Sequence, residues 1–386
     1  MCKVIIIGGG PIGLACAALL AQRGIGSRVL DARPLEPARR DVRLLALSRG
    51  TWEILMPVLG ADLPPRAAIR AVYVSSAGDF GATHIGADDF DGADLGATTL
   101  YGDLLAALAA SVAVQPAIEV LRPVAATAVQ QRHDRVEVLL ADGSTLCADL
   151  AIHAEGAIAA PAAGDDAVAV DDWAVLADLR LRPTRADLPA GAAFERFTRD
   201  GPLALLPTPS ALGSGVGRVL SMVWCMGAAE ARRRSELSDS ALLDELQAQL
   251  GARIGTVTAI GPRRAVALPR RMREQVHHHR TVALGNAAQT LHPVAGQGFN
   301  LGVRDCVTLA DELAQGANCT EALARYARRR RADRAAITLL TGSLPALFAS
   351  RFVPLAVARG IGLALLDAAP PLRRELAHLL MFGVRS

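Results

Sequence analysis

Three glycines near the start of the chain have the spacing of a phosphate-binding turn. Gly8, Gly10 and Gly13 form the pattern G-x-G-x-x-G directly after the apolar run Val4–Ile7, and Asp31 follows a second apolar run. In such a turn the first glycine allows a tight bend, the second admits a pyrophosphate, and the third lets helix and strand pack closely; an acid after the next strand binds ribose hydroxyls. The complete order therefore predicts a dinucleotide site rather than a glycine-rich turn of another α/β protein.

A second glycine-rich segment lies near residue 290. The short apolar run Val282–Leu284 leads into Gly285 and Asn286, and a loop containing Pro293 ends at Gly296–Gly298, where a helix is expected to begin. Free N–H groups at a helix start carry partial positive charge, and glycines let a ligand approach the backbone. This segment predicts a strand–loop–helix corner that suits a phosphate or the anionic edge of a ring.

Apolar periodicity and turn residues predict the elements that must position these segments. The chain begins as strand, helix and strand, the order of a parallel α/β sheet, and residues 172–225 alternate in polarity as antiparallel strands do. The expected strands of that sheet are Trp173–Leu181, Ala192–Thr198, Leu203–Leu206 and Arg218–Trp224, and a hairpin is expected from Val136–Leu140 and Thr145–Ala151. The expected helices are 14–22, 99–112 and 238–250, followed by a mostly helical region at 320–386.

The composition narrows the class of protein. Of 386 residues, 51% are hydrophobic and the mean hydropathy is +0.29, yet no apolar run reaches the ~18 residues that a bilayer span needs. The high hydrophobic content fits a protein that handles an apolar substrate or touches a membrane. It fits equally well a protein from an organism whose proteome is rich in alanine. A net charge of +3 is too small to indicate nucleic-acid binding. The six cysteines form no C-x-x-C pair and no secretory signal is visible, so we expect reduced thiols in a cytoplasmic protein.

Six segments, in the same order, resemble those of known flavoproteins. They are GGGPIG at 8–13, DVRLLALS at 41–48, LG at 95–96, FERFTRDGPLALLP at 194–207, the block 285–305, and YARRRRADRAAITLLTGSLPALF at 326–348. Together they resemble the FAD-dependent aromatic hydroxylases with a single nucleotide fold, and within these the ubiquinone-biosynthesis hydroxylases. With Asn286 and Gln289 where relatives more often carry Asp and His, GNAAQTLHP is most similar to the 2-polyprenyl-6-methoxyphenol hydroxylase branch.

The resemblance implies an α/β fold built on a single Rossmann-type FAD-binding domain that is discontinuous in sequence. Its parts would be residues 1–70, 95–170 and 262–320. Residues 71–94 and 171–261 would form an antiparallel substrate sheet, the α+β part of the fold, and residues 321–386 a C-terminal helical region. The flavin would lie between the nucleotide domain and the sheet, which explains why the two glycine-rich segments are so far apart.

The resemblance also implies the reaction. NADPH or NADH would reduce FAD, O2 would add to the flavin, and the flavin hydroperoxide would hydroxylate a polyprenylated methoxyphenol ring on the path to ubiquinone. One alternative keeps this chemistry but acts on a small soluble aromatic, although residues 194–224 are mostly apolar. A second alternative is an FAD-holding accessory subunit of a quinone-biosynthesis complex with little hydroxylase activity.

Individual residues receive roles from the resemblance. Asn286 would contact the ribityl hydroxyls, and backbone amides near Gly298 would stabilise charge on the reduced flavin. Arg43, in the DVR motif, would lie beside the cofactor, although an arginine on the surface is the alternative. The expected FAD contacts are Gly8, Gly10, Pro11, Ile12, Gly13, Asp31, Ala32, Arg33, Arg43, Glu155, Asn286, Pro293, Gly296, Gln297, Gly298, Phe299 and Asn300. The expected catalytic residues are Arg43, His292, Pro293 and Gly298.

Three of these assignments have a plain structural alternative. Pro293 would place its carbonyl near the reacting ring, or would simply start a helix. His292 would help to deprotonate a phenol, since an unperturbed histidine has a pKa of about 6.5, or would hydrogen-bond the loop backbone. Arg33 would contact the adenosine end of the cofactor, or would lie in solvent.

The chain departs from its relatives at two places. Many relatives carry Gly-Ala-Asp-Gly followed by Ser and Val-Arg, whereas this chain has His153-Ala154-Glu155-Gly156 and then an Ala/Pro run. Many also carry an arginine in the helix near residue 100, where Tyr101 and Gly102 stand here. Glu155 could reach the partner of the missing Asp, but the nicotinamide contacts stay unassigned.

Two clusters of basic residues need separate interpretation. His277–His279 are adjacent on an extended segment and do not converge on one ion, so we expect no metal site. Arg325, Arg328–Arg331 and Arg334 precede the uncharged stretch 335–350. This pattern fits contact of a peripheral protein with an anionic membrane on its inner face, or with a partner subunit, and also fits an ordinary packed helix. A homodimer is a further alternative.

Overall fold

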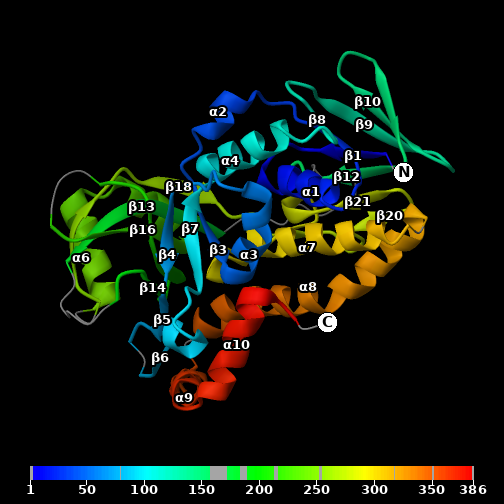
Figure 1. Ribbon diagram of the computed structural model, residues 1–386. Coiled ribbons are helices and arrows are strands. Elements are labelled where there is room, and N and C mark those ends of the chain that lie inside the picture. Colours follow the sequence, from blue (N-terminus) through cyan, green and yellow to red (C-terminus); the bar gives the residue numbers. More distant parts are fainter. Residues whose placement is uncertain are drawn as a thin grey trace.

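The computed structural model describes residues 3–78, 80–156, 172–182, 189–212, 216–251, 254–316, 318–349 and 352–384. Two large sheets dominate it (Figure 1). One has six strands in the order β20-β21-β12-β1-β2-β8, and the other contains β17-β13-β16-β15-β14-β5-β6 with β18 attached to β13. The predicted α/β class, with a second large sheet beside the nucleotide fold, is therefore confirmed.

The six-stranded sheet is the nucleotide fold. Strand β1 (Val4–Ile7) lies near its middle, so all four of its side chains are buried. Val4 and Ile6 pack with the helices on one face, and Ile5 and Ile7 pack on the other. The parallel strands are β1, β2 (Ser27–Leu30), β8 (Ile118–Leu121), β12 (Leu150–His153) and β21 (Thr281–Ala283), and β20 (His277–His278) is antiparallel at the edge.

Opposite faces of this sheet are covered by different elements. One face packs against α1 (Pro11–Ala21), α4 (Tyr101–Ala113) and α7 (Gln297–Ala314). The other face packs against the small sheet of β9 (Ala126–Gln131), β10 (Val136–Leu140) and β11 (Thr145–Ala148). The predicted strand Thr145–Ala151 is wrong at its end, since the chain leaves β11 and joins the nucleotide sheet as β12. The chain passes from one sheet to the other at Asp149. Its carboxylate accepts a hydrogen bond from the Lys3 amide at 2.7 Å, which holds this point of the chain beside the start of β1.

All four strands predicted for residues 172–225 are present in the second sheet. They are β13 (Asp172–Arg182), β14 (Ala192–Phe197), β15 (Pro202–Pro207) and β16 (Arg218–Gly227), joined by β5 (Ala71–Ser76), β6 (Ala82–Gly86), β17 (Thr256–Ile260) and β18 (Arg264–Ala267). The expectation of a purely antiparallel sheet is wrong, because β14 runs parallel to β5. The sheet also continues past residue 261, where we expected it to end, because β18 pairs with β13.

Helices cover one face of this second sheet, at the left of Figure 1. Alternate side chains of β13 to β16 pack there with α5 (Ala228–Glu236) and α6 (Asp239–Leu250). Ser238 caps α6 as predicted, since its hydroxyl accepts a hydrogen bond from the Ala241 amide. The opposite, inner face is turned toward the third sheet, formed by β3 (Leu44–Ser48), β4 (Arg66–Ile69) and β7 (Gly96–Leu100), with α3 (Arg49–Leu59) behind it.

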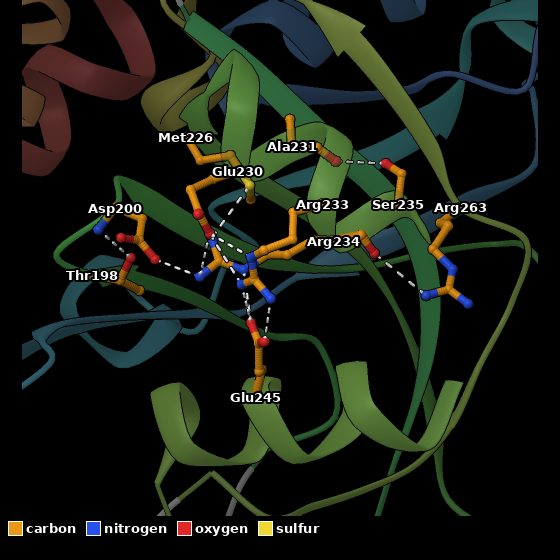
Figure 2. Close-up of polar contacts among 10 residues, drawn as sticks. All are labelled: Thr198, Asp200, Met226, Glu230, Ala231, Arg233, Arg234, Ser235, Glu245 and Arg263. Carbon is orange, nitrogen blue, oxygen red and sulfur yellow. Dashed lines mark hydrogen bonds and ion pairs between the residues drawn. The ribbon is translucent and has the colours of Figure 1, made fainter. Parts of the chain in front are cut away.

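A buried arginine fixes the helices to the second sheet (Figure 2). The Arg234 guanidinium lies 4.0 Å from the centre of the Trp224 ring, and pairs with Asp200 at 2.5 Å and Glu245 at 3.0 Å. Arg233 also binds Glu245, and its hydrogen bond is the largest reason why the pKa of Glu245 falls to about 2. Because Asp200 lies between β14 and β15, this network also holds the hairpin that the two strands form.

The C-terminal region is helical, as predicted, and contains α8 (Cys319–Ala349), α9 (Val353–Ala368) and α10 (Pro370–Phe382). Of the interpretations of the basic run on α8, the ordinary packed helix agrees with most of its contacts, because most of its arginines turn toward neighbouring elements. Arg330 pairs with Asp305 of α7 at 2.6 Å, and Arg325 and Arg329 both pair with Glu312 of α7. Ion pairs with the carboxylates of α7 therefore neutralise much of this positive charge and hold the two helices together.

The Arg330–Asp305 pair should be essential for stability. Replacing Arg330 by Met leaves Asp305, which has no exposed surface, without a counter-ion, and removing one partner of a buried pair typically costs about 3–5 kcal/mol. We expect Arg330→Met to lose that much free energy of unfolding in urea denaturation. Arg328→Met, at an exposed position of the same helix, should change it by less than about 0.5 kcal/mol. Equal effects of the two changes would contradict the assignment.

Candidate active site

The first glycine-rich segment forms a close-packed turn at the carboxyl end of β1. Gly8 has φ +107°, and a Cβ atom there would lie 2.3 Å from the Ala154 carbonyl oxygen. A Cβ on Gly13 would lie 1.9 Å from the Gly8 oxygen, whereas a Cβ on Gly10 would meet only the Tyr101 hydroxyl, at 3.1 Å. Gly8 and Gly13 are therefore required for packing, while Gly10 opens the uncapped start of α1 to an approaching ligand.

Asp31 lies beside this turn, at the end of β2. Its carboxylate is buried and accepts hydrogen bonds from the amides of Gly9 and Arg33, each at 2.8 Å. Arg122, directly after β8, contacts the Gly9 carbonyl and lies 3.6 Å from the Asp31 carboxylate. Sequence reasoning missed Arg122, although its position at the end of a parallel strand was the available signal. Arg33 is mostly exposed and approaches Asp31 only to 3.8 Å, and Ala32 is exposed.

Ile12 joins the second glycine-rich segment to the first. A Cβ atom on Gly285 would lie 3.1 Å from Ile12, and one on Gly302 would lie 2.8 Å from it. The short helix η2 (Gly285–Ala287), α1 and α7 therefore meet around one side chain. Pro11 is buried at the first turn of α1, and Asn286 is exposed at the edge of this junction. The structure thus brings together segments that are separated by more than two hundred residues of sequence.

At the start of α7 the backbone has room for a ligand, whereas several side chains already contact other parts of the protein. Gly296 has φ +60°, and a Cβ on Gly298 would meet no atom within 4 Å. The Gln297 side chain donates to the Leu380 carbonyl, and Asn300 bridges α7 to the backbone of β3. Phe299 packs against the core of the nucleotide fold. The backbone amides of the first turn of α7, which include those of Gln297 and Gly298, are therefore the groups suited to the cofactor contacts that we expect.

Arg43 lies near the start of α1 through its contact with Tyr101. Its guanidinium pairs with Asp41 at 2.6 Å and stacks 4.6 Å from the centre of the Tyr101 ring, whose hydroxyl borders Gly10. Burial alone would raise the pKa of Asp41, but the hydrogen bond from Arg43 lowers it. Burial raises the pKa of Tyr101, so its hydroxyl stays protonated as a hydrogen-bond donor. Tyr101 thus occupies the region where relatives carry an arginine, and holds Arg43 in place.

Glu155 follows β12 and is paired with a neighbour rather than with the turn. Its carboxylate lies 2.8 Å from Nδ1 of His153, and the side chain is 41% exposed. The Ala/Pro run that follows, including residues 157–163, lies outside the described residues. Glu155 at the cofactor therefore remains a prediction, and the nicotinamide contacts remain unassigned.

His292 is buried beside a cavity of about 210 Å³. Its Nδ1 atom accepts a hydrogen bond from the Val294 amide at 3.3 Å, and burial, followed by the nearby charge of Arg270, lowers its pKa to about 4. The ring is therefore neutral at pH 7 and a weak base, which weakens the expectation that it deprotonates a phenol. The Pro293 carbonyl accepts a hydrogen bond from the Gly296 amide at 2.9 Å. The cavity is lined by Arg270, Arg271, Met272, Thr290, Leu291, His292, Thr338, Thr341 and Gly342.

Comparison with known proteins identifies the family. The model of the FAD binding domain family matches residues 1–340 of the chain. The chain belongs to this family. Ubiquinone hydroxylase UbiL of Rhodospirillum rubrum is 29% identical over 96% of this chain and 87% of its own length. The 3-demethoxyubiquinol 3-hydroxylase of Escherichia coli is 28% identical over 97% of this chain and 96% of its own. The predicted resemblance is thus confirmed, and the chain is an FAD-dependent monooxygenase.

A solved structure supports the fold independently. PqsL of Pseudomonas aeruginosa, in complex with 2-aminobenzoylacetate, superposes with a TM-score of 0.74 at 20% identity, covering 94% of this chain and 99% of its own. At that identity the similarity concerns the fold alone. It agrees with the arrangement of one nucleotide fold beside one large mixed sheet.

The geometry of the two segments fits FAD. We propose that the turn at Gly8–Gly13 and the start of α1 hold the pyrophosphate, that Asp31 binds the adenosine ribose, and that amides near Gly298 face the ring. Bound FAD supplies the redox chemistry that activates oxygen, with NADPH or NADH as the reductant. The chain itself binds and orients the cofactor and keeps water away from it.

Gly298→Ala tests the proposed ring contact without disturbing the fold. The new methyl group would meet no protein atom within 4 Å, so we expect unchanged thermal stability of the cofactor-free protein. If the ring packs against this backbone, FAD affinity should fall by roughly tenfold or more, equivalent to about 1.4 kcal/mol, in a fluorescence titration. Gly362→Ala, an equally open position in α9, should leave FAD affinity unchanged. Equal affinity of both variants for FAD would remove Gly298 from the site.

His292 should make stability depend on pH in a defined direction. The unfolded chain protonates this histidine near its ordinary pKa of about 6.5, whereas the folded chain does so only at about 4. The stability due to the neutral ring is therefore lost as pH falls between these values. We expect the loss of unfolding free energy from pH 7 to pH 4.5 to be about 2–3 kcal/mol smaller in His292→Asn than in the wild type. The exposed His133→Asn control should lose as much as the wild type, and an identical loss in His292→Asn would contradict the burial argument.

Proposed function

We propose that this monooxygenase hydroxylates a polyprenylated methoxyphenol ring in ubiquinone biosynthesis. The observation that carries the proposal is similarity along nearly the whole chain to two proteins named for ubiquinone hydroxylation. That similarity includes the second sheet, which lies opposite the cofactor segments and is where a substrate-specific surface is expected.

The inner face of the second sheet supports an apolar substrate. Its side chains pack with β3 and the C-terminal helices as one hydrophobic cluster, which includes Ala193, Leu206, Ala46 and Met381. The Phe197 ring stacks on Phe348 of α8 with centroids 3.8 Å apart. A prenyl chain would replace such contacts with contacts of the same kind, whereas a small charged aromatic would not.

The C-terminal helices suggest how an apolar substrate would reach the protein. Among the described residues no single helix is long and apolar enough to cross a membrane, although α9 and α10 together would be, with a bend of 98° between them. Val357, Ile361 and Leu365 repeat every four residues along α9 and are 43–60% exposed. We propose that this stripe rests on a membrane surface and receives the substrate there. A partner subunit or a second copy of the chain would cover the same stripe.

The hydroxylase activity has a direct test. Purified enzyme supplied with FAD, NADPH and a short-chain prenylated methoxyphenol should yield a product that has gained one oxygen atom, measured by mass spectrometry. NADPH consumption should match product formation. Bound flavin that NADPH cannot reduce would instead support an accessory subunit, and rapid hydroxylation of unprenylated phenols alone would support a small soluble substrate.

The membrane contact can be tested separately from the chemistry. The double variant Ile361→Asp and Leu365→Asp should bind anionic lipid vesicles at least tenfold more weakly than the wild type in co-sedimentation, because two buried apolar contacts are worth about 1.5–3 kcal/mol each. FAD content should not change. Val114→Asp, at an 81% exposed position directly after α4, is the matched control and should bind vesicles normally. Unchanged vesicle binding of the double variant, with a change in oligomeric state, would favour a protein partner.

A further inference from the structure

Glu195 of β14 is a half-buried residue, and one oxygen of its carboxyl group, Oε1, lacks a hydrogen-bond partner. Its Oε1 atom is shielded from solvent, and no described residue donates a hydrogen bond to it. Burial raises the pKa of this carboxyl to about 7. An unpaired carboxyl in an apolar setting destabilises the fold, so its presence calls for a reason other than packing.

The chain does not leave carboxylates unpaired elsewhere in its described interior. Asp31, Asp305, Glu312 and Asp333 are buried, and each has an arginine within 3.6 Å. An arginine is available next to Glu195 as well, since Arg196 follows it directly. Neighbouring residues of a strand point to opposite faces, and Arg196 binds the Ser75 hydroxyl at 2.9 Å. Glu195 therefore has no arginine partner among the described residues, because its side chain lies on the opposite face of the sheet from Arg196.

That face is the inner one, toward the cofactor segments. Phe194 packs into the outer core beneath α6, whereas Ala193 packs with Ala46 of β3 and Phe197 stacks on α8. Glu195 shares the face of Ala193 and Phe197 because side chains alternate along a strand. Ala46 in turn lies 3.0 Å from the Cβ position of Gly296, at the start of α7. Glu195 is thus on the wall of the second sheet that faces the proposed flavin site.

The surroundings of Glu195 contain few other titratable groups. The residues paired with it are Ala204 of β15 and Val74 of β5, neither of which titrates. From β16, Cys225 is close enough for the charge of Glu195 to contribute to its raised pKa, and burial is the larger cause. The charges of Asp172 and Arg270 also affect the pKa of this thiol, and these two residues form an ion pair at 2.6 Å. Arg270 also lines the cavity beside His292. From α8, Phe348 brings an uncharged ring, and the Arg359 guanidinium of α9 lies 5.6 Å from the centre of that ring. On the β15 side, the neighbour of Glu195 is the small side chain of Ala204.

We propose that Glu195 is the catalytic acid–base residue of the hydroxylation, exchanging a proton with the phenolic hydroxyl of the substrate. This inference rests on the proposed function. Phenols are attacked at carbon far more readily once ionised, and a general base works best when its pKa lies near the working pH. His292, the base that the sequence suggested, is too weak for this task, whereas no arginine of the described residues forms an ion pair with the carboxyl of Glu195.

The proton movements balance. The phenolic O–H bond breaks, its proton passes to Oε1 of ionised Glu195, and the electron pair stays on the phenolate oxygen. The ring carbon then gains one oxygen atom of O2 as a hydroxyl group, its C–H bond breaks, and that proton returns to the phenolate oxygen. The second oxygen atom leaves as water. NADPH supplies two electrons as hydride and solvent supplies one proton; with the proton held by Glu195, these provide the hydrogen of the new hydroxyl group and both hydrogens of the water, so Glu195 returns to its ionised form.

Two variants and two substrates test this role in the FAD-loaded enzyme. Glu195→Gln keeps the shape and removes the titrating group, and Glu195→Asp keeps a carboxyl one methylene further away. The first substrate is a short-chain prenylated methoxyphenol, and the second is its fluorinated analogue, whose phenol is already ionised at the assay pH. Glu119→Gln, on the exposed strand β8, is the matched control. Flavin content and thermal stability are measured for each variant.

The expected result separates chemistry from structure. With the first substrate, Glu195→Gln should lose roughly 100-fold in kcat and the rise of kcat with pH around 7, whereas Glu195→Asp should keep that rise. With the ionised analogue, Glu195→Gln should approach the wild-type rate. An unchanged kcat and pH profile in Glu195→Gln, or an equal loss with both substrates, would overturn the acid–base role. Failure of the wild type to hydroxylate either phenol would instead overturn the proposed function.

Discussion

The whole arrangement depends on the contact of Ile12 with two glycines of distant segments. A Cβ atom at Gly285 or Gly302 would crowd Ile12, and one at Gly302 would also lie 3.1 Å from the Gly285 backbone, so glycine at both positions allows α1, η2 and α7 to pack this closely. This junction places two uncapped helix starts at the same edge of the nucleotide sheet. An elongated cofactor with an anionic pyrophosphate and an electron-accepting ring needs such a pair of anchors.

The rest of the molecule stabilises this junction from two sides. On one side the carboxylates of α7 bind arginines of α8, which orders a 31-residue helix along the nucleotide fold and carries it to the second sheet. On the other side Asn300 ties α7 to β3, and β3 packs on the inner face of that sheet. The inner face of the second sheet is thereby held next to β3, and on that face the Oε1 atom of Glu195 has no hydrogen-bond partner among the described residues.

The nucleotide fold could be predicted from local patterns because strand, glycines, helix and acid follow one another in the sequence. Strands β13 to β16 could be predicted equally well, since alternation of apolar and polar residues indicates a sheet with two different faces. The parallel pairing of β14 with β5 was not, because it joins segments more than a hundred residues apart. The same limit applies to Arg122 and to the inward turn of Arg330, whose partners are distant in sequence. Burial lowers the pKa of His292 and raises that of Glu195, and neither effect can be read from residue type.

Mass spectrometry of quinone-pathway lipids from cells that lack this gene tests the central claim most directly. The account predicts that a prenylated methoxyphenol accumulates, that ubiquinone is lost, and that the intact gene restores it. Restoration should fail with a variant that binds no FAD. Unchanged ubiquinone in the absence of the gene would contradict the assignment of the substrate.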